Sequence, residues 1–464
     1  MGVKINYDYF EEKHEECGIV AIYSKKGADV APLIYKALMA LQHRGQDAAG
    51  FTIYSDGKLE TRLGIGLVDR IFEEKDVQIK GSVGIGHTRY PTAGDCRMCD
   101  VQPFVHKNIA VAHNGHIPNY LDLKKTLEKD GYNFSSTVDS EVISYIIDKN
   151  VKAGTEKAVG QIMKSVDGAY SIVSIIDGKI TIFRDPHGIR PLIWGENEEY
   201  ICFASESVAL DINNIQYRGS VNPGELVTIE KGKITRKQIE KSPLKHCMFE
   251  YVYFSRPDSV INDKSIYEVR KRLGQILARE APIKADVVVP VPDTSRGAAS
   301  SYAAALSIPC EEGLIKNRYI GRTFIMPNQE KRVDAVRVKL NPIKEIIAGK
   351  SVVLVDDSIV RGTTLKEIVS LVRSAGAKEV HIRIPCPPIK APCFYGVDMS
   401  TYKELIANRK TVDEIRKFLG ADSLYYISIE GLKEAINQPI CTGCLNEDYH
   451  SDYVRKLAKS IKSQ

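Results

Sequence analysis

The sequence of 464 residues lacks any apolar run that approaches the roughly 20 residues of a membrane-spanning helix. Its first sixteen residues, MGVKINYDYFEEKHEE, contain no hydrophobic stretch of the kind that directs secretion. The net charge is only +5, and the basic residues form no clustered stripe of the kind found in nucleic-acid binders. Internal repeats and low-complexity segments are also absent. We therefore expect a globular cytoplasmic protein with no membrane or nucleic-acid partner.

Cysteine is present in moderate number, with 10 residues in the chain. In a reducing compartment such a set does not form a disulfide framework, so each cysteine is buried, catalytic or metal-binding. Cys202 and Cys310 have no distinctive neighbours, and we expect both to be core thiols.

The first half of the chain consists of short β-branched and aromatic runs separated by Gly, Asn and Asp turns, which is typical of strands. Examples are CGIVAIYS, AAGFTIYS, IAVAHNG and AYSIVSII. Two stretches, VAPLIYKALMALQHR and SSTVDSEVISYIIDKNVKAG, predict helices. Because the strands form one block with few helices between them, we predict a layered α+β domain of mostly antiparallel sheets.

The second half alternates helices with uniformly apolar short runs. A helix is predicted over residues 265–280, and apolar runs follow at 287–291 and in SVVLVDD at 351–357. This alternation favours an α/β domain with a parallel sheet that is covered on both sides. We place the boundary in the charged stretch KGKITRKQIEKSP, which gives domains at 17–240 and 241–464.

Cys17 opens the first apolar strand, directly after sixteen mostly polar residues. An isolated cysteine at such a place is usually a small buried side chain. The segments that follow favour a catalytic role: LQHRGQDAAG, GHTRYPTAG, HNGHIPN, TVDSE and RDPHGIRPL. In this order they resemble the N-terminal-nucleophile glutamine amidotransferases. The resemblance implies that residues 1–16 are a propeptide, whose removal frees the α-amine of Cys17 to act as general base for its own thiol.

The same resemblance assigns the rest of the glutamine site. The Asn114 side chain and the Gly115 backbone N–H would stabilise the oxyanion, while Arg89 pairs with the α-carboxylate of glutamine and Asp139 with its α-ammonium. His87 and His113 are interpreted as structural histidines.

The segment SVVLVDDSIVRGTT combines a buried strand, two consecutive acids and a small-residue loop that opens a helix. Backbone N–H groups and hydroxyls between Ser358 and Thr364, with a helix N-terminus behind them, suit a phosphate dianion. A capped helix after a strand would explain Thr363 and Thr364, but not two adjacent acids at the end of a buried strand.

This segment resembles the signature of type I phosphoribosyltransferases, which bind phosphoribosyl pyrophosphate (PRPP). The resemblance implies that Asp356 and Asp357 hold the ribose hydroxyls or the metal bound to them. The loop that would cradle the 5′-phosphate consists of Ser358, Ile359, Val360, Arg361, Gly362, Thr363 and Thr364.

Two further segments belong to this second resemblance. VVVPVPDTSRGAAS would be the pyrophosphate loop, in which Ser295 contacts Mg²⁺. Residues 314–341 are rich in Lys and Arg, a pattern usually found on a solvated face. The resemblance instead implies a flexible lid over PRPP. Within it, we take Lys316 to Ile325 as the candidate moving part, whose Tyr319, Phe324 and Ile325 would wall an apolar passage for ammonia once closed.

Cys441-Thr-Gly-Cys444 is a CxxC pair that fits a redox pair, half a zinc site or half an iron–sulfur site. Among enzymes that carry both domains, those with a [4Fe–4S] cluster add one cysteine in CMFEYVYF and one in PCFYG. Here these cysteines are Cys247 and Cys393. Zinc remains the alternative metal, and the neighbouring thiol of Cys386 is a competing ligand. A second CxxC, at Cys96 and Cys99, has no assigned role.

Together the two resemblances imply an enzyme that places ammonia from glutamine on PRPP, in the first committed step of purine synthesis. Purine nucleotides are the expected inhibitors, and a homotetramer or homodimer is the expected assembly. Two alternatives are another glutamine amidotransferase of the same class and a PRPP-sensing regulator. LVDDSIVRGTT argues against the first, and no DNA-binding module supports the second.

Overall fold

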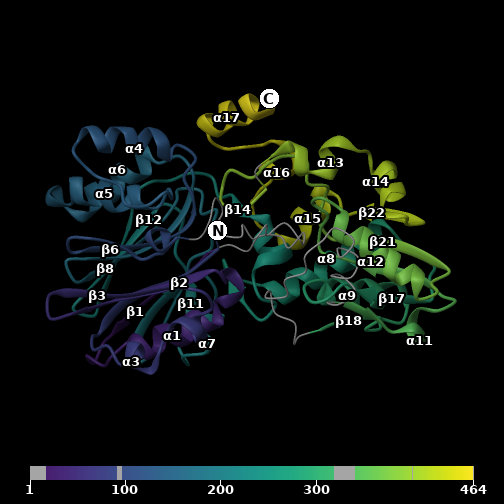
Figure 1. Ribbon diagram of the computed structural model, residues 1–464, viewed down its shortest axis with the longest axis horizontal. Helices are drawn as coiled ribbons and strands as arrows, with labels where there is room; N and C mark the ends of the chain where they lie inside the picture. Colours follow the sequence, from purple (N-terminus) through teal and green to yellow (C-terminus); the bar gives the residue numbers. More distant parts are fainter. Residues whose placement is uncertain (1–16, 91–96, 318–339, 400, 463–464) are drawn as a thin grey trace, which may run out of the picture.

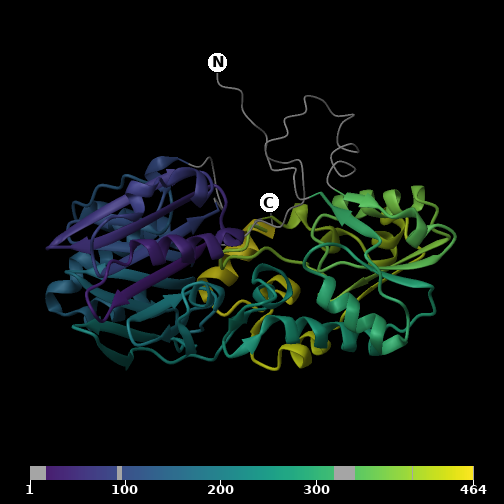
Figure 2. The ribbon, with the colours of Figure 1, turned by 90° about the horizontal axis from the view of Figure 1, so that it is seen from below.

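The computed structural model describes residues 17–90, 97–317, 340–399 and 401–462. The predicted propeptide, Cys96, and Tyr319 with most of the predicted lid lie outside the described residues. The chain forms two lobes, with the C-terminal segments drawn in yellow between them (Figure 2).

The first lobe contains two antiparallel sheets. The seven-stranded sheet has the order β11-β9-β10-β1-β4-β2-β3. Its strands are β1 (Gly18–Ser24), β2 (Ala48–Ser55), β3 (Lys58–Ile65), β4 (Val83–Arg89), β9 (Ile193–Glu196), β10 (Tyr200–Ala204) and β11 (Gln216–Ser220). The six-stranded sheet has the order β13-β12-β8-β7-β6-β5. Its strands are β5 (Phe104–His106), β6 (Ile109–His116), β7 (Ala169–Ile176), β8 (Lys179–Arg184), β12 (Glu225–Glu230) and β13 (Lys233–Gln238).

The two sheets stack face to face, and helices cover both outer faces (Figure 1). Strand β1 shows why its sequence is apolar throughout: Ile19 and Ala21 pack toward the second sheet, whereas Val20 and Ile22 pack under α1 (Ala31–Ala40). Three helices cover the outer face of the six-stranded sheet: α4 (Tyr120–Lys129), α5 (Glu141–Asn150) and α6 (Thr155–Ser165). The predicted layered α+β architecture is confirmed.

The helix predicted over residues 30–44 is interrupted. α1 ends at Ala40, and a single 3₁₀ turn, Gln42–Arg44, follows. Gly45 then passes so close to Arg89 that a Cβ on it would lie 2.6 Å from the Arg89 backbone. The chain therefore turns under β4, and this turn sets the position of Arg44.

The second lobe is built on a parallel sheet with the order β17-β20-β21-β22, as the alternation of helices and apolar runs predicted. Its strands are β17 (Val287–Pro290), β20 (Ser351–Val355), β21 (Glu379–Ile384) and β22 (Ser423–Tyr426). The main helices are α8 (Ile266–Glu280), α9 (Arg296–Leu306), α12 (Thr363–Ser374), α14 (Val412–Leu419) and α15 (Ile429–Ile436). Helix α8 begins one residue after its predicted start, because Ser265 caps it by accepting a hydrogen bond from the Glu268 N–H.

The junction between the lobes is made by segments that are distant in sequence. The charged stretch that holds the predicted boundary begins as β13 in the first lobe, and β14 (His246–Cys247) then pairs in parallel with β23 (Ile440–Cys441). Near α17 (Asp452–Lys462), Ser451 donates a hydrogen bond to Asp167 of the first lobe. The C-terminal segment thus returns to the first lobe.

Short elements connect the main ones, together with the 3₁₀ helices Met98–Asp100, Val151–Ala153 and Tyr402–Glu404. They are α2 (Val68–Ile71), α3 (Glu74–Val77), α7 (Val208–Asp211), α11 (Lys344–Ile347), α13 (Ile406–Arg409), α16 (Gly443–Asn446), β15 (Val260–Ile261), β16 (Lys264–Ser265), β18 (Leu314–Lys316), β19 (Leu340–Pro342) and a π-helix, Glu250–Phe254. Within the described ranges, no helix is both long and apolar enough to span a membrane.

Candidate active sites

The predicted nucleophile, Cys17, lies directly before β1 and is partly buried. Its Sγ is 3.9 Å from the carbonyl oxygen of Tyr90, at the end of β4. The Arg44 guanidinium donates through Nε to the Cys17 carbonyl oxygen at 3.2 Å. The 3₁₀ turn after α1 therefore fixes the backbone of the nucleophile.

The two predicted oxyanion donors lie at the end of β6, in the sheet that faces β1. Asn114 is 1% exposed, and its Nδ2 has no hydrogen-bond partner among the described residues. Gly115 has φ +149°, and a Cβ on it would lie 1.9 Å from the Ala169 carbonyl oxygen, so only glycine fits. A buried amide donor that is left unpaired is costly. Such a donor indicates an acceptor that arrives with a ligand.

The predicted contacts to the glutamine backbone groups are a buried side chain, Arg89, and a partly buried one, Asp139. Arg89 donates to the Asp100 carbonyl oxygen. Asp139 accepts a hydrogen bond from the Ile117 N–H at 2.7 Å and lies 3.1 Å from His116 Nδ1. Burial raises the pKa of Asp139, but the His116 hydrogen bond and charge outweigh it and hold the pKa below its ordinary value. The carboxylate is therefore charged at neutral pH, as binding of an ammonium requires.

The two histidines that were interpreted as structural are both buried, His87 on the face of β4 toward the other sheet and His113 on the face of β6 toward α5. His113 Nδ1 is 2.9 Å from Ser140 Oγ, and burial lowers the pKa of the ring. Burial lowers the pKa of His87 to about 3. Both rings are neutral at physiological pH.

In the second lobe, both predicted PRPP segments begin at the same edge of the parallel sheet. Pairing of Val287 with Val352 and of Pro290 with Val355 aligns the ends of β17 and β20. Ligands of open α/β sheets bind at this edge.

The two acids that follow β20 are held in a tight turn. The Asp357 N–H donates to Asp356 Oδ1 at 2.9 Å, and Ser358 Oγ donates to Asp357 Oδ1 at 2.8 Å. Gly362, with φ +81°, ends the loop and α12 begins at Thr363. The first N–H groups of α12 thus face the loop at a positive helix end.

Two other predicted side chains have partners of their own. Arg361 pairs with Glu404 at 2.7 Å. Ser295, which is 1% exposed at the start of α9, donates to the Val291 carbonyl oxygen within its own loop. The predicted Mg²⁺ contact of Ser295 remains a prediction.

Five thiols gather where the junction meets the second lobe. Cys247 and Cys441 are register partners in β14 and β23. Burial raises the pKa of Cys444 well above its ordinary value, and the thiols of Cys393, Cys441, Cys247 and Cys386 raise it further. Within the described ranges, no group of three or more His, Cys, Asp or Glu side chains is arranged to hold a single metal ion. The thiols are therefore close enough to affect one another's pKa.

The remaining described cysteines divide between surface and core. Cys202 is fully buried, as predicted, and Cys99 is exposed. The prediction that Cys310 is a core thiol is wrong, because Cys310 is exposed. It forms a bridge with Val288 on the open side of β17, the edge strand of the sheet.

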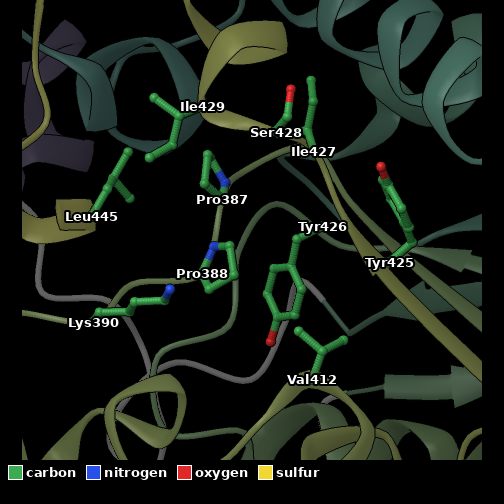
Figure 3. Close-up of a pocket in the computed structure, with 10 residues that line it drawn as sticks. All are labelled: Pro387, Pro388, Lys390, Val412, Tyr425, Tyr426, Ile427, Ser428, Ile429 and Leu445. Atoms are coloured by element: carbon green, nitrogen blue, oxygen red, sulfur yellow. The ribbon is translucent and has the colours of Figure 1, made fainter.

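A cavity of about 360 Å³ lies beyond the carboxyl ends of β21 and β22 (Figure 3). Its lining is mostly apolar and consists of Pro387, Pro388, Lys390, Val412, Tyr425, Tyr426, Ile427, Ser428, Ile429 and Leu445. None of the predicted site residues lines it.

The sequence analysis missed a buried ion network beside Cys17. Arg44, which is 1% exposed, contacts Glu206 Oε1 at 2.5 Å and Glu250 Oε1 at 2.7 Å. Burial raises the pKa of Glu206, but His43 and Arg44 outweigh it and hold the pKa well below its ordinary value. One signal was available: the glutamate inside the apolar run CMFEYVYF, which needs a cationic partner when buried.

Comparison with known families gives one match in each lobe. A model described as a glutamine amidotransferase domain matches residues 87–211. A model described as a phosphoribosyl transferase domain matches residues 259–418. Both resemblances predicted from the sequence are thus confirmed.

Relatives match the chain across both lobes. It is 48% identical over 452 residues to the amidophosphoribosyltransferase of Methanothermobacter thermautotrophicus, covering 94% of this chain and 95% of the relative. It is 44% identical to amidophosphoribosyltransferase 2, chloroplastic, of Arabidopsis thaliana, covering 96% and 81%. The solved structure of the glutamine PRPP amidotransferase from B. subtilis, complexed with ADP and GMP, superposes with a TM-score of 0.87 at 39% identity, covering 94% of this chain and 98% of that one.

Proposed function

Because this chain belongs to the amidophosphoribosyltransferase family, we propose that its two lobes divide the family's reaction between them. The protein transfers ammonia from glutamine to PRPP and gives 5-phosphoribosylamine, glutamate and pyrophosphate, in the first committed step of purine biosynthesis. Phosphoribosyltransferases generally use Mg²⁺. The matches in both lobes set aside the two alternatives, a different glutamine amidotransferase and a PRPP-sensing regulator.

In the first lobe, the Cys17 thiolate attacks the side-chain amide of glutamine. The carbonyl oxygen becomes an oxyanion, ammonia leaves, and water then hydrolyses the thioester to glutamate. The unpartnered Nδ2 of buried Asn114 is the observation that carries this assignment, since it donates to the oxyanion beside the Gly115 N–H. Arg89 and Asp139 bind the α-carboxylate and the α-ammonium. Removal of residues 1–16 supplies the α-amine as general base.

In the second lobe, Asp356 and Asp357 bind the ribose hydroxyls of PRPP or the Mg²⁺ bound to them. Residues 358–364 hold the 5′-phosphate through backbone N–H groups and the start of α12. Alignment of β17 with β20 supports this proposal, because it brings the pyrophosphate loop and Ser295 to the same edge.

We further propose that Cys247, Cys393, Cys441 and Cys444 hold a [4Fe–4S] cluster. When bound, the cluster would hold the C-terminal segment against the junction and would take no part in ammonia transfer. The gathering of these thiols at the junction supports the proposal, because iron–sulfur clusters are held by cysteine thiolates. The Tyr395 N–H donates to Cys393 Sγ at 3.4 Å, a contact that would stabilise a cluster-bound thiolate.

The proposal for regulation comes from a solved relative. The B. subtilis structure is a complex with ADP and GMP, so we propose that purine nucleotides inhibit this protein as well. We also propose a homotetramer or homodimer, and a cytoplasmic location.

The test is Cys17→Ala, with Cys99→Ala as the control at an exposed cysteine of the same lobe. We expect Cys17→Ala to abolish glutamine-dependent synthesis and to retain ammonia-dependent synthesis. Intact mass of the wild type checks removal of residues 1–16, and metal analysis should find about four irons per chain. Loss of both activities in a folded Cys17→Ala variant would contradict the division between lobes, and a zinc-loaded protein without iron would contradict the cluster.

A further inference from the structure

The glutamine site of the first lobe is held in place by residues from the second domain. We propose that Glu250 and Gly396 are positioning residues for glutamine hydrolysis: Glu250 fixes the nucleophile, and Gly396 fixes the oxyanion hole. The inference rests on the functions proposed above for Cys17 and Gly115.

On the nucleophile side, the contact runs through Arg44. Both oxygens of Glu250 accept hydrogen bonds from Arg44, Oε1 from Nη2 at 2.7 Å and Oε2 from Nη1 at 3.0 Å. Nε of the same guanidinium donates to the Cys17 carbonyl oxygen at 3.2 Å. Glu250 and Arg44 are each 1% exposed. Because a planar guanidinium held at two points cannot rotate, Glu250 sets where the Cys17 backbone lies.

On the oxyanion side, the contact is one of backbone against backbone. A Cβ on Gly396 would lie 3.1 Å from the carbonyl carbon of Gly115 and 2.8 Å from Arg190 Nη2. Arg190 Nε donates to the Tyr395 carbonyl oxygen at 2.8 Å, which anchors this segment. The segment with Cys393 therefore lies against the backbone of Gly115, the residue whose N–H is the proposed oxyanion donor, and a side chain at residue 396 would displace that backbone or Arg190.

The two sides share one carboxylate. Arg190 Nη1 is 3.6 Å from Glu250 Oε1, so Glu250 faces both Arg190 and Arg44. Glu206 adds a second negative charge on Arg44. A shift of the second lobe therefore moves both the nucleophile and the oxyanion donor, because these buried charges stay paired only in one arrangement.

The first test is Gly396→Ala, with Gly154→Ala as the matched control. Gly154 has a similar φ, +105° against +109°, but nothing lies within 4 Å of the place that its Cβ would take. In Gly396→Ala, displacement of the oxyanion donor should lower kcat for glutamine hydrolysis about tenfold or more and change KM less than about twofold. Alkylation of Cys17 by iodoacetamide needs no oxyanion donor and should keep its rate.

The second test is Glu250→Gln, with Glu434→Gln as the control in an exposed pair with Arg279. Here the nucleophile itself is displaced, so glutamine hydrolysis and the alkylation of Cys17 should both slow about tenfold. Glu250→Asp keeps the charge and should recover part of both rates. Ammonia-dependent synthesis should stay at the wild-type rate in every variant and reports correct folding.

The outcomes distinguish the proposed positioning roles of Glu250 and Gly396 from the proposed catalytic role of Cys17. Glutamine hydrolysis by Cys17→Ala would contradict the proposed nucleophile. If Cys17→Ala is inactive but Gly396→Ala and Glu250→Gln hydrolyse glutamine at the wild-type rate, the positioning roles are wrong. A uniform fall in hydrolysis, alkylation and ammonia-dependent synthesis would show only structural damage and would also overturn them. Should Glu250→Gln fail to fold, the decrease in kcat expected of Glu250→Asp decides the question.

Discussion

The two lobes differ in how they stabilise the acids of their candidate sites. In the first, the buried Glu206 pairs with the buried Arg44, and the partly buried Asp139 lies 3.1 Å from His116. In the second, Asp356 and the buried Asp357 follow a strand of a parallel sheet and accept hydrogen bonds from the Asp357 N–H and from Ser358 Oγ in their own turn. Ion pairs inside the protein stabilise the first set, whereas acids at the carboxyl edge of a parallel sheet lie where ligands of such sheets bind. Removal of Glu206 should therefore affect folding, and substitution of Asp356 or Asp357 should affect catalysis.

The largest effect is expected for Glu206→Leu. Glu206 contacts Arg44 Nη1 and accepts hydrogen bonds from the Arg256 N–H and from Ser259 Oγ. Its removal leaves buried Arg44 with one carboxylate fewer, so the free energy of unfolding should fall by about 3–5 kcal/mol. Urea unfolding of the variant and the wild type measures this loss of stability. A loss below about 1 kcal/mol would mean that the internal ion network does not distinguish the first lobe from the second.

The second effect is catalytic and belongs to the other lobe. Asp356→Asn or Asp357→Asn should weaken transition-state binding of PRPP by about 1.5–3 kcal/mol, since each removes a charged hydrogen-bonding partner. Synthesis should slow with glutamine and with ammonia alike, while unfolding in urea and the basal hydrolysis of glutamine at Cys17 stay unchanged. Wild-type turnover of PRPP with ammonia would show that LVDDSIVRGTT is structural.

The third effect is the acid sensitivity of the first lobe. Burial lowers the pKa of His87 to about 3, from 6.5 for an exposed ring. As the pH falls below 6.5, the unfolded chain binds this proton before the folded chain does, so stability falls by about 1.4 kcal/mol per pH unit until the folded pKa is reached. His87→Leu should reduce the fall in Tm between about pH 7 and pH 5. An unchanged pH dependence would assign acid sensitivity to other groups.

The smallest effects are expected at the surface, where the lobes should not differ. Lys179–Glu230 in the first lobe and Arg279–Glu434 in the second are ion pairs whose side chains are all about half exposed. Replacing either glutamate by Ala should cost less than about 1 kcal/mol in urea unfolding. A larger cost in one lobe would mean that its whole surface, and not only its site, depends on charge pairing.

Prediction from sequence succeeded where neighbouring residues decide the structure. The apolar runs at 287–291 and 351–357 predicted β17 and β20, because a strand that is buried on both faces does not alternate apolar and polar residues. The break after α1 escaped prediction because its cause, the Arg89 backbone against Gly45, is distant in sequence. Cys310 was misplaced for a similar reason: its local sequence does not reveal that it lies at the open edge of a sheet.

The sequence by itself determined the order of the two domains, the fold class of each and the chemistry expected of each motif. Turn residues, strand runs and helix starts act over a few neighbouring positions, so they can be read from the sequence directly. Only the tertiary structure decided that Glu250 reaches Arg44, 206 positions earlier, and that Gly396 lies against Gly115. Such contacts depend on how the lobes dock, because a buried charge takes whichever partner the fold brings within hydrogen-bonding distance.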